Sequence, residues 1–275
     1  MEKLLLDVID LAVKAGEIVL CEGDEGAFEI GNKGTKENYV TSTDLKVQDY
    51  LKRELTALLP GSYFMGEEGD LPQMDSELVG SDRWVWIVDP IDGTANYARG
   101  MENSVVSIAL MKRGTVVLGV VRHPYLDLTF WAQKGQGAFL NGKPIHVSDR
   151  TIEHAMLATA FSAYDKSRAP ACFAIAQRLY NTCEDIRRTG TAAFELCMLA
   201  KGAVDIYFEI NLSPWDYAAA TRIVKEAGGC TTSLDGDVHL YGPGPVMAAN
   251  TPENLEFVRK VVDDEVGEAY RKGTL

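Results

Sequence analysis

The chain has 275 residues, of which 46% are hydrophobic and 24% are charged, and its formal net charge is −13. This length and balance are typical of a globular protein with a large core, built as one domain or as two closely packed halves. The negative charge argues against a nucleic-acid partner and against docking on anionic membranes, because both need basic surfaces. An anionic substrate is not excluded, since bound divalent cations can reverse the local charge.

The first predicted elements are helices. Apolar residues at helical spacing predict a helix over residues 3–20, and the charged residues that interrupt it argue against a signal peptide. Residues 22–38 are rich in Gly, Lys and Glu and predict a mobile loop or a loose hairpin. A second helix is expected to begin near Thr43–Asp44 and to end at Pro60-Gly61.

Strands dominate the next part of the chain. A short strand, Tyr63–Met65, is followed by Gly66-Glu67-Glu68-Gly69, and after a polar loop at 71–82 comes the apolar strand Trp84–Val88. Residues 104–147 then predict a β-meander with clear turn signals between its strands. The expected strands of the meander are Ser104–Met111, Thr115–Arg122, Leu128–Ala132 and Ala138–Leu140.

After about residue 148 strands and helices alternate. The expected strands are Met156–Ala160, Asp185–Arg187, Val204–Glu209 and Val246–Ala249. The expected helices are Pro170–Asn181, Ala192–Lys201, Asp216–Ala227 and a last one from about Pro252. The change of rhythm predicts an α+β half over residues 1–147 and an α/β half over residues 148–275.

The five cysteines are scattered and form no CxxC pair, so neither a zinc knuckle nor a redox motif is indicated. They are typical of free thiols in a reducing cytosol, which predicts a cytoplasmic protein. The four histidines lie far apart, outside any metal-ligand spacing. Any metal site in this chain is therefore expected to use oxygen ligands.

The run Asp89-Pro90-Ile91-Asp92-Gly93-Thr94 follows an apolar strand and carries the most specific signal. Carboxylates at the end of a buried strand are costly unless a cation meets them. Oxygen atoms from Asp89, from Asp92 and from a backbone carbonyl in the turn suit a hard metal ion. Gly93 permits a close approach to the backbone, and the amides that follow could meet an anion.

Three further acidic positions stand where elements begin or end: Asp44, Glu67-Glu68 and Asp216. Each alone has an ordinary interpretation, a helix cap or a solvated turn. Together with the Asp89–Asp92 run they fit one oxygen-lined site for Mg²⁺ or a similar ion. Such a site favours phosphoryl chemistry, and the absence of a GxxxxGK[ST] run and of a GxSxG elbow makes hydrolysis by metal-activated water the simplest mechanism.

These residues resemble the signatures of the inositol monophosphatase family, lithium-sensitive Mg²⁺-dependent sugar phosphatases related to fructose-1,6-bisphosphatase. The matching stretches span nearly the whole chain: Val40–Asp44, Gly66–Glu68, Asp89–Thr94 with Asn96, Gly190–Ala193, and Trp215–Ala220 followed by Glu226–Gly229. Ala220 stands where the family commonly has glycine, and Ala95 and Tyr97 where it often has Thr and Phe. No metal-ligand position is lost.

The resemblance implies a layered αβαβα sandwich of the sugar-phosphatase type and a hydrolase that binds two or three Mg²⁺ ions. Glu67, Asp89 and the carbonyl of Ile91 would hold the first metal. Asp89, Asp92 and Asp216 would hold the second, and a weaker third ion would lie near Glu67. The family also implies inhibition by Li⁺ and a homodimer.

The resemblance also implies roles in catalysis. Thr94 and Asp44 would relay the proton of the attacking water, which Glu67 helps to hold through the first metal. The amides of Gly93 and Thr94 would bind phosphate oxygens. Near Asp216, a metal-bound water would supply the proton of the leaving alcohol.

Substrate recognition is implied at a separate set of residues: Asp92, Gly93, Thr94, Gly190, Thr191, Ala192, Glu209 and Asp216. Glu209 would accept hydrogen bonds from ring hydroxyls, and Ala192 would offer backbone to the same ring. Arg187 and Arg188 could reach a substrate or a subunit interface. Lys36 could cover the phosphate or could be an ordinary solvated lysine.

The expected function is hydrolysis of myo-inositol monophosphate or a similar polyol or sugar phosphate. The same chemistry on fructose 1,6-bisphosphate, 3′-phosphoadenosine 5′-phosphate or histidinol phosphate is the alternative within the enzyme class. A non-catalytic interaction protein, or a module that senses phosphates without cleaving them, is the alternative outside it. The intact set of metal-ligand positions argues against an interaction protein as the main role, and the Thr94–Asp44 pair argues against a sensing module, because binding alone needs no proton relay.

Overall fold

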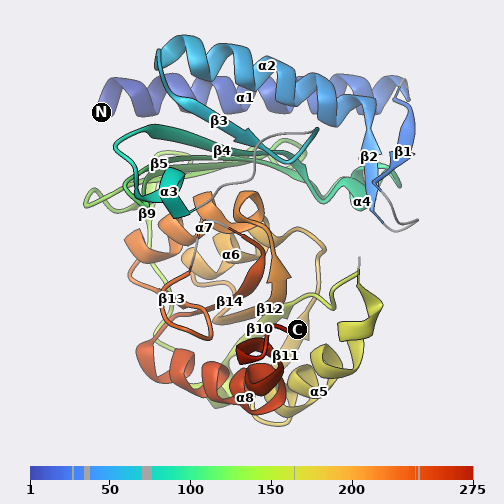
Figure 1. Cartoon of the computed structure of the whole chain (residues 1–275), viewed down its shortest axis with the longest axis vertical. Helices are drawn as coiled ribbons and strands as arrows, with labels where there is room; N and C mark the ends of the chain where they lie inside the picture. Colours follow the sequence, from blue (N-terminus) through green and yellow to red (C-terminus); the bar gives the residue numbers. More distant parts are fainter. Residues whose placement is uncertain are drawn as a thin grey trace.

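A computed structural model describes residues 1–26, 28–33, 38–69, 76–163, 165–238, 240 and 242–274. The described chain forms five layers (Figure 1). Helices α1 (Glu2–Glu25) and α2 (Ser42–Leu58) cover a seven-stranded sheet; α6 (Ala192–Ala200) and α7 (Pro214–Glu226) lie between it and a five-stranded sheet. Helices α5 (Ala169–Tyr180) and α8 (Pro252–Arg271) form the last layer. The expected layered αβαβα sandwich is confirmed.

The seven-stranded sheet follows chain order from β3 to β9, and only β3 and β4 run parallel. Its strands are β3 (Tyr63–Gly66), β4 (Trp84–Asp92), β5 (Val105–Lys112), β6 (Thr115–His123), β7 (Leu128–Gln133), β8 (Ala138–Leu140) and β9 (Lys143–Ile145). Two short helices, α3 (Ser76–Gly80) and α4 (Thr94–Tyr97), flank β4 in the chain. The predicted meander is confirmed.

The five-stranded sheet has the order β11-β10-β12-β14-β13. Its strands are β10 (Met156–Thr159), β11 (Asp185–Arg187), β12 (Ile206–Leu212), β13 (Cys230–Thr232) and β14 (Gly244–Ala249). The strands β11, β10 and β12 run parallel, whereas β14 is antiparallel to both of its neighbours. Each sheet comes from one half of the chain, although the helices α6 and α7 of the second half pack against the first sheet. That the halves are separate domains stays a prediction.

Strand β4 shows why apolar runs form the centre of the sandwich. Val85 and Ile87 belong to the core between the two sheets, whereas Trp86 and Val88 belong to the core beneath α1 and α2. Successive side chains of a strand point to opposite faces, so a strand buried on both faces must be apolar throughout. A third core lies between the second sheet and the helices α5 and α8.

Helix α7 approaches β6 with no side chain between the two backbones. A Cβ atom on Gly119 of β6 would lie 2.4 Å from the carbonyl oxygen of Ala219. Ala218, Ala219 and Ala220 are fully buried. Small residues on both elements therefore set the distance between α7 and the first sheet.

The structure corrects several sequence-based boundaries. The first helix continues to Glu25 instead of ending near residue 20. Of the two alternatives expected for residues 22–38, a mobile loop or a loose hairpin, the described residues show a hairpin, formed by β1 (Ile30–Asn32) and β2 (Tyr39–Thr41). Strand β4 continues through Asp92 because β5 pairs with it as far as Val105. The elements α3, β9 and β13 were not expected, and each is only three to five residues long.

The five cysteines are free thiols, as expected, and Cys172, Cys183 and Cys197 are buried. None of the helices in the described ranges is both long and apolar enough to cross a membrane.

Candidate active site

Asp89 and Asp92 lie on the last part of β4, where the strand is irregular. They are 1% and 8% exposed, and the register with β5 shifts between them. Residues three apart in a regular strand point to opposite faces, so the bulge is what allows both to serve one site. The amide of Ile91 donates to Asp89 Oδ1 at 3.0 Å and holds that carboxylate over the bulge.

Gly93 makes the turn out of β4 and places Thr94 against Asp44. Its φ of 92° is a conformation that glycine adopts without strain, and a Cβ there would lie 2.4 Å from Thr191 Cγ2. The Thr94 hydroxyl lies 3.1 Å from Asp44 Oδ1 and 3.0 Å from the carbonyl oxygen of Ile91. One hydroxyl proton can be donated to only one of these acceptors at a time.

Asp44 occupies the first turn of α2 through a capping box. Thr41 is the N-cap, and its side chain accepts from the amide of Asp44, while Asp44 Oδ2 accepts from the Thr41 amide at 2.8 Å and from the Thr41 hydroxyl. Burial raises the pKa of Asp44 to about 6, although the bonds from Thr41 oppose the increase. Its remaining oxygen, Oδ1, faces Thr94.

The acidic pair after β3 is held by Gln48 of α2. Gln48 Nε2 donates to the Glu68 carbonyl at 2.7 Å, and the Glu68 amide donates to Gln48 Oε1 at 2.9 Å. Gly66 leaves the space for this contact, because a Cβ there would lie 2.1 Å from Gln48 Oε1. The amide of Glu67 donates to the Val88 carbonyl at 3.2 Å, which aligns the end of β3 with β4.

Lys33 reaches the same acidic pair from the hairpin. Its Nζ lies 2.7 Å from Glu67 Oε1 and 2.5 Å from Glu68 Oε1. Burial lowers the pKa of Lys33, but the two carboxylates outweigh this effect and raise it above its usual value. Burial, followed by the charge of Glu67, raises the pKa of Glu68 to about 7. The sequence reasoning considered Lys36, which lies outside the described residues, and missed Lys33.

Asp216 stands in the first turn of α7 and repeats the capping-box geometry. Ser213 is the N-cap, and its amide donates to Asp216 Oδ2 at 2.8 Å. Strand β5 fixes the start of this helix, because the Ser107 hydroxyl donates to the Trp215 carbonyl at 3.3 Å. Neither Asp44 nor Asp216 is an N-cap; both are the third residue of their helices.

The loop before α6 meets the end of β4. The amide of Ala193 donates to Asp92 Oδ2 at 2.7 Å, and Thr191 contacts Gly93. Glu195 of α6, which is 2% exposed, accepts bonds from the Thr189 amide and hydroxyl and from the Gly190 amide of this loop. Burial raises the pKa of Glu195 to about 7, against these donors. Glu195 was not predicted, although an acidic residue in the first turn of a helix is a recognisable signal.

Glu209 of β12 forms another part of the acidic cluster. The Tyr207 hydroxyl donates to Glu209 Oε2 at 2.9 Å. Burial raises the pKa of Glu209 to about 8; the bond from Tyr207 and the charge of Arg188 oppose this, and the charge of Glu195 adds to it. The negative charge of Glu209 also raises the pKa values of Asp92 and Asp216, so all three lie within electrostatic reach of one another.

The pKa values of Asp89, Asp92 and Asp216 are all raised well above normal. Burial is the largest cause in each case, and the negative charge of Glu67 raises all three. Within the described ranges, no three His, Cys, Asp or Glu side chains converge tightly enough to form a finished metal cage. Instead the carboxylates accept from Lys33, Ile91, Ala193 and Ser213.

The chemistry of this cluster fits a hard cation. Its possible ligands are all oxygen atoms, from Glu67, Asp89, Asp92, Asp216 and the Ile91 carbonyl. Several buried carboxylates in one place repel one another, and a divalent ion relieves this repulsion more completely than Lys33, which bonds only to Glu67 and Glu68. Besides burial, the charges of Glu67, Asp92 and Asp216 raise the pKa of Asp89, so all three carboxylates lie within electrostatic reach of it, and the role of the four as metal ligands stays a prediction.

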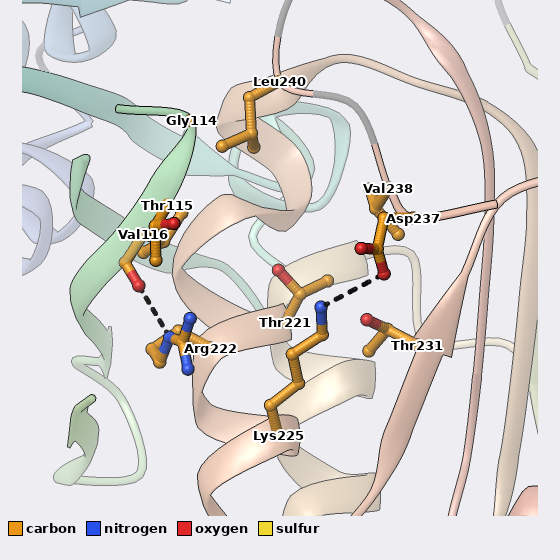
Figure 2. Close-up of a pocket in the computed structure, with 10 residues that line it drawn as sticks. All are labelled: Gly114, Thr115, Val116, Thr221, Arg222, Lys225, Thr231, Asp237, Val238 and Leu240. Atoms are coloured by element: carbon orange, nitrogen blue, oxygen red, sulfur yellow. Dashed lines mark hydrogen bonds and ion pairs between the residues drawn. The ribbon is translucent and has the colours of Figure 1, made fainter. Parts of the chain in front are cut away.

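A hollow lies beside the C-terminal half of α7, at the end opposite Asp216 (Figure 2). It has a volume of about 150 Å³ and is lined by Gly114, Thr115, Val116, Thr221, Arg222, Lys225, Thr231, Asp237, Val238 and Leu240. Arg222 Nε donates to the Val116 carbonyl at 2.7 Å, and Lys225 Nζ lies 4.0 Å from Asp237 Oδ1. With a single carboxylate among its lining residues, this hollow does not offer the ligand set of a divalent metal.

Known proteins are similar to this chain over nearly its whole length. The model of the inositol monophosphatase family matches residues 1–266. The chain belongs to the inositol monophosphatase family. Curated relatives are named Nus factor SuhB: the protein of Escherichia coli strain K12 is 33% identical over 99% of this chain and 100% of its own length. That of Vibrio cholerae is 35% identical over the same shares.

Solved structures agree with the fold. An IMPase of Thermotoga maritima superposes with a TM-score of 0.84 at 30% identity, covering 98% of this chain and 99% of that one. The suppressor protein SuhB of Bartonella henselae superposes with a TM-score of 0.83 at 31% identity, covering 93% and 96%. The family consists of metal-dependent phosphatases, so the acidic cluster lies in a fold associated with that chemistry.

Proposed function

We propose that the protein is an Mg²⁺-dependent phosphomonoesterase that hydrolyses myo-inositol monophosphate or a similar polyol phosphate. The observation that carries the proposal is the Thr94 hydroxyl at 3.1 Å from Asp44 Oδ1, beside the cluster of buried carboxylates. A threonine hydroxyl is a poor base unless a carboxylate accepts its proton, so this pair has the composition of a proton relay.

Two or three Mg²⁺ ions would be held by Glu67, Asp89, Asp92, Asp216 and the carbonyl of Ile91. When bound, such ions lower the pKa of a water and stabilise the charge on the leaving oxygen of a phosphate ester. Asp89 is central to this set, because the charges of Glu67, Asp92 and Asp216 all raise its pKa. Lys33 would have to release at least part of Glu67 when a cation is bound there.

The protein's own groups divide the remaining work. Asp44 Oδ1 accepts the proton that the Thr94 hydroxyl passes on, and the Asp44 carboxylate stays in place because Thr41 occupies its other oxygen. The amides of Gly93 and Thr94 would bind phosphate oxygens, since the absence of a side chain on Gly93 exposes the backbone there. Glu67 would contribute to catalysis as one of the residues that hold a metal ion.

The alcohol side of the substrate would face the second half of the chain. Glu209 accepts hydrogen bonds from ring hydroxyls, and Gly190, Thr191 and Ala192 offer backbone and hydroxyl groups beside it. A carboxylate at this position favours a polyhydroxylated ring over an adenine base, which would need a stacking surface. Fructose 1,6-bisphosphate, 3′-phosphoadenosine 5′-phosphate and histidinol phosphate remain the competing substrates.

The test is phosphate release from a panel of esters by the purified protein, with and without Mg²⁺, compared by kcat/KM. We expect Mg²⁺-dependent activity that is highest on inositol phosphates and is inhibited by Li⁺. Asp89→Asn should abolish it, with the exposed Asp264→Asn as the matched control. Near wild-type activity of Asp89→Asn would refute the metal assignment, and a higher kcat/KM on an adenosine bisphosphate would refute the substrate.

A second candidate function is a role in transcription through protein contacts, favoured by the name Nus factor that the curated relatives share. The net charge of −13 points to protein rather than nucleic acid as the partner. The Asp89→Asn variant can be expressed in cells that lack the gene. If this variant restores normal transcription, the role in transcription does not depend on catalysis. A homodimer is expected in either case, and its mass in solution tests this.

A further inference from the structure

A buried network connects the segment after β4 to the loop before α6. The Thr189 carbonyl accepts from Asn96 Nδ2 and from Asn103 Nδ2, each at 2.9 Å. Asn96 Nδ2 also donates to the Asn103 carbonyl at 2.9 Å, which closes the segment between these two asparagines. Two side chains from the first half of the chain therefore hold the Thr189 carbonyl of the second half in place.

Glu195 holds the same residue from the opposite side. Its Oε1 accepts from the Thr189 amide, from the Thr189 hydroxyl at 2.9 Å and from the Gly190 amide at 3.2 Å. The carbonyl, amide and hydroxyl of Thr189 are thus all hydrogen-bonded, to buried Asn96, half-buried Asn103 and buried Glu195. Because each of its polar groups is hydrogen-bonded, Thr189 is held in one position.

His123 fixes the orientation of Asn103. Its Nε2 lies 3.2 Å from Asn103 Oδ1, and its ring lies edge-on to Phe194 of α6 at 4.7 Å between centroids. Burial lowers the pKa of His123 to about 4, so the ring is neutral near pH 7 and can donate from one nitrogen. Donation to Asn103 Oδ1 leaves Nδ2 pointing at Thr189.

The hydrogen bonds to Thr189 accompany a direct contact between the loop at Gly93–Thr94 and the loop at Gly190–Ala192. A Cβ on Gly93 would lie 2.4 Å from Thr191 Cγ2, and a Cβ on Gly190 would lie 3.2 Å from Asn96 Nδ2. No layer of side chains or space for adjustment separates the loop at Gly93–Thr94 from the loop at Gly190–Ala192. The distance between them therefore depends on the bonds to Thr189.

We propose that Asn96, Asn103 and Glu195 are positioning residues that set the distance between the phosphate-side loop Gly93–Thr94 and the ring-side loop Gly190–Ala192. By fixing it, they make the enzyme selective for phosphate esters whose alcohol is a polyhydroxylated ring. This inference rests on the proposed function, because it assigns phosphate to one loop and alcohol to the other. None of the three residues needs to touch the reacting atoms, since each acts through Thr189.

The test compares an inositol phosphate with p-nitrophenyl phosphate, whose flat leaving group cannot use ring hydroxyl contacts. In Asn103→Ala and in Glu195→Ala, kcat/KM for the inositol phosphate should fall on the order of 10- to 100-fold, as expected for misplaced substrate. Activity on p-nitrophenyl phosphate and inhibition by inorganic phosphate should stay near wild type. Glu195→Gln should recover most of the loss, because its amide oxygen still accepts from Thr189 and Gly190.

Asn141→Gly is the matched control. Asn141 Nδ2 donates to the Asp127 carbonyl at 2.9 Å in a turn outside the site, and glycine tolerates its φ of 48°. This variant loses that bond and the one that Asn141 Oδ1 accepts from the Thr129 amide at 2.7 Å, and it should leave the ratio of the two activities unchanged. Asn103 is partly exposed, so its truncation should fold even if that of buried Glu195 does not.

Equal losses on both esters, or none, would overturn the positioning role. Amide hydrogen exchange of Thr189 and Gly190 provides a readout that needs no activity. Exchange should accelerate in Asn103→Ala and Glu195→Ala and stay slow in Glu195→Gln; unchanged exchange would overturn the inference. A wild-type protein that hydrolyses neither ester would refute the proposed function, while the exchange rates would still decide whether these residues fix the loop.

Discussion

The first turns of α2 and α7 are built alike, yet their acidic residues face different surroundings. Asp44 and Asp216 are both the third residue of their helices, and in each the Oδ2 atom accepts from the amide of the N-cap at 2.8 Å. The other oxygen of Asp44, Oδ1, accepts from the Thr94 hydroxyl. Asp216 faces the charges of Glu67, Asp92 and Glu209.

This comparison separates local from tertiary causes. The sequence S/T-x-x-D determines how each carboxylate is held, because the capping box depends only on residues within one turn. What each carboxylate does depends on elements far away in the chain. A hydroxyl donor beside Asp44 suits proton transfer, whereas the like charges around Asp216 favour either protonation or a bound cation.

Among the substitutions that test this comparison, Asp216→Asn should have the largest effect on metal binding and activity. The amide oxygen of asparagine can still accept from Ser213, so the helix start should remain while one negative metal ligand is lost. Mg²⁺ affinity and kcat/KM should both fall by more than the roughly 10- to 100-fold that outer-shell partners of a metal contribute. Calorimetry measures the Mg²⁺ affinity, and phosphate release measures kcat/KM. Normal Mg²⁺ affinity in this variant would show that Asp216 is not a metal ligand.

Asp44→Asn should separate proton transfer from metal binding. The same isosteric change keeps the bond to Thr41 but removes the base that accepts from Thr94. We expect kcat to fall about 10²-fold or more, the usual contribution of a general base, with Mg²⁺ affinity little changed. If the two aspartates give the same pattern of losses, the distinction drawn between the two helix starts is wrong.

Glu209→Gln should have a smaller and more selective effect. Exchanging a charged acceptor for a neutral one weakens bonds to ring hydroxyls, so kcat/KM for inositol phosphate should fall about tenfold. Activity on p-nitrophenyl phosphate should change far less. Equal losses on both esters would show that Glu209 supports the site as a whole rather than the ring.

The metal-free protein should lose stability as the pH rises from about 4 toward 8. Burial raises the pKa of Asp44 to about 6, that of Glu195 to about 7 and that of Glu209 to about 8, so the native state binds more protons than the unfolded chain over this range. The contribution of these groups to the free energy of unfolding is largest at low pH and is lost as each carboxyl group ionises. Mg²⁺ should therefore raise Tm more at pH 8 than at pH 5; the reverse order in thermal melts would contradict the charge assignment.

Much of this molecule could be predicted from its sequence because its signals are local. Apolar residues at helical or strand spacing predicted most helices and strands, and the turn signals between its strands predicted the meander. Asp89, Asp92 and Asp216 stood out because carboxylates beside buried elements need a reason to be there. The short elements β9 and β13 were missed because three residues carry too little periodicity.

The missed site residues depend on contacts between distant segments. Lys33 gains its partners only when the hairpin folds back on β3, 34 residues away in the chain from Glu67. Asn103 and Thr189 meet across 86 residues, and nothing near either one in the sequence marks it as unusual. The backbone contact between Gly119 and Ala219 likewise appears only when the layers are assembled.

That backbone contact limits how the protein can change over generations. Where α7 rests on β6, any side chain in place of Gly119 would collide with the Ala219 carbonyl, so the spacing of these two elements leaves no room for small adjustments. Substitutions are more readily accommodated in the loops around the acidic cluster. A lineage with this architecture can therefore vary those loops while it inherits the distance between α7 and the first sheet unchanged.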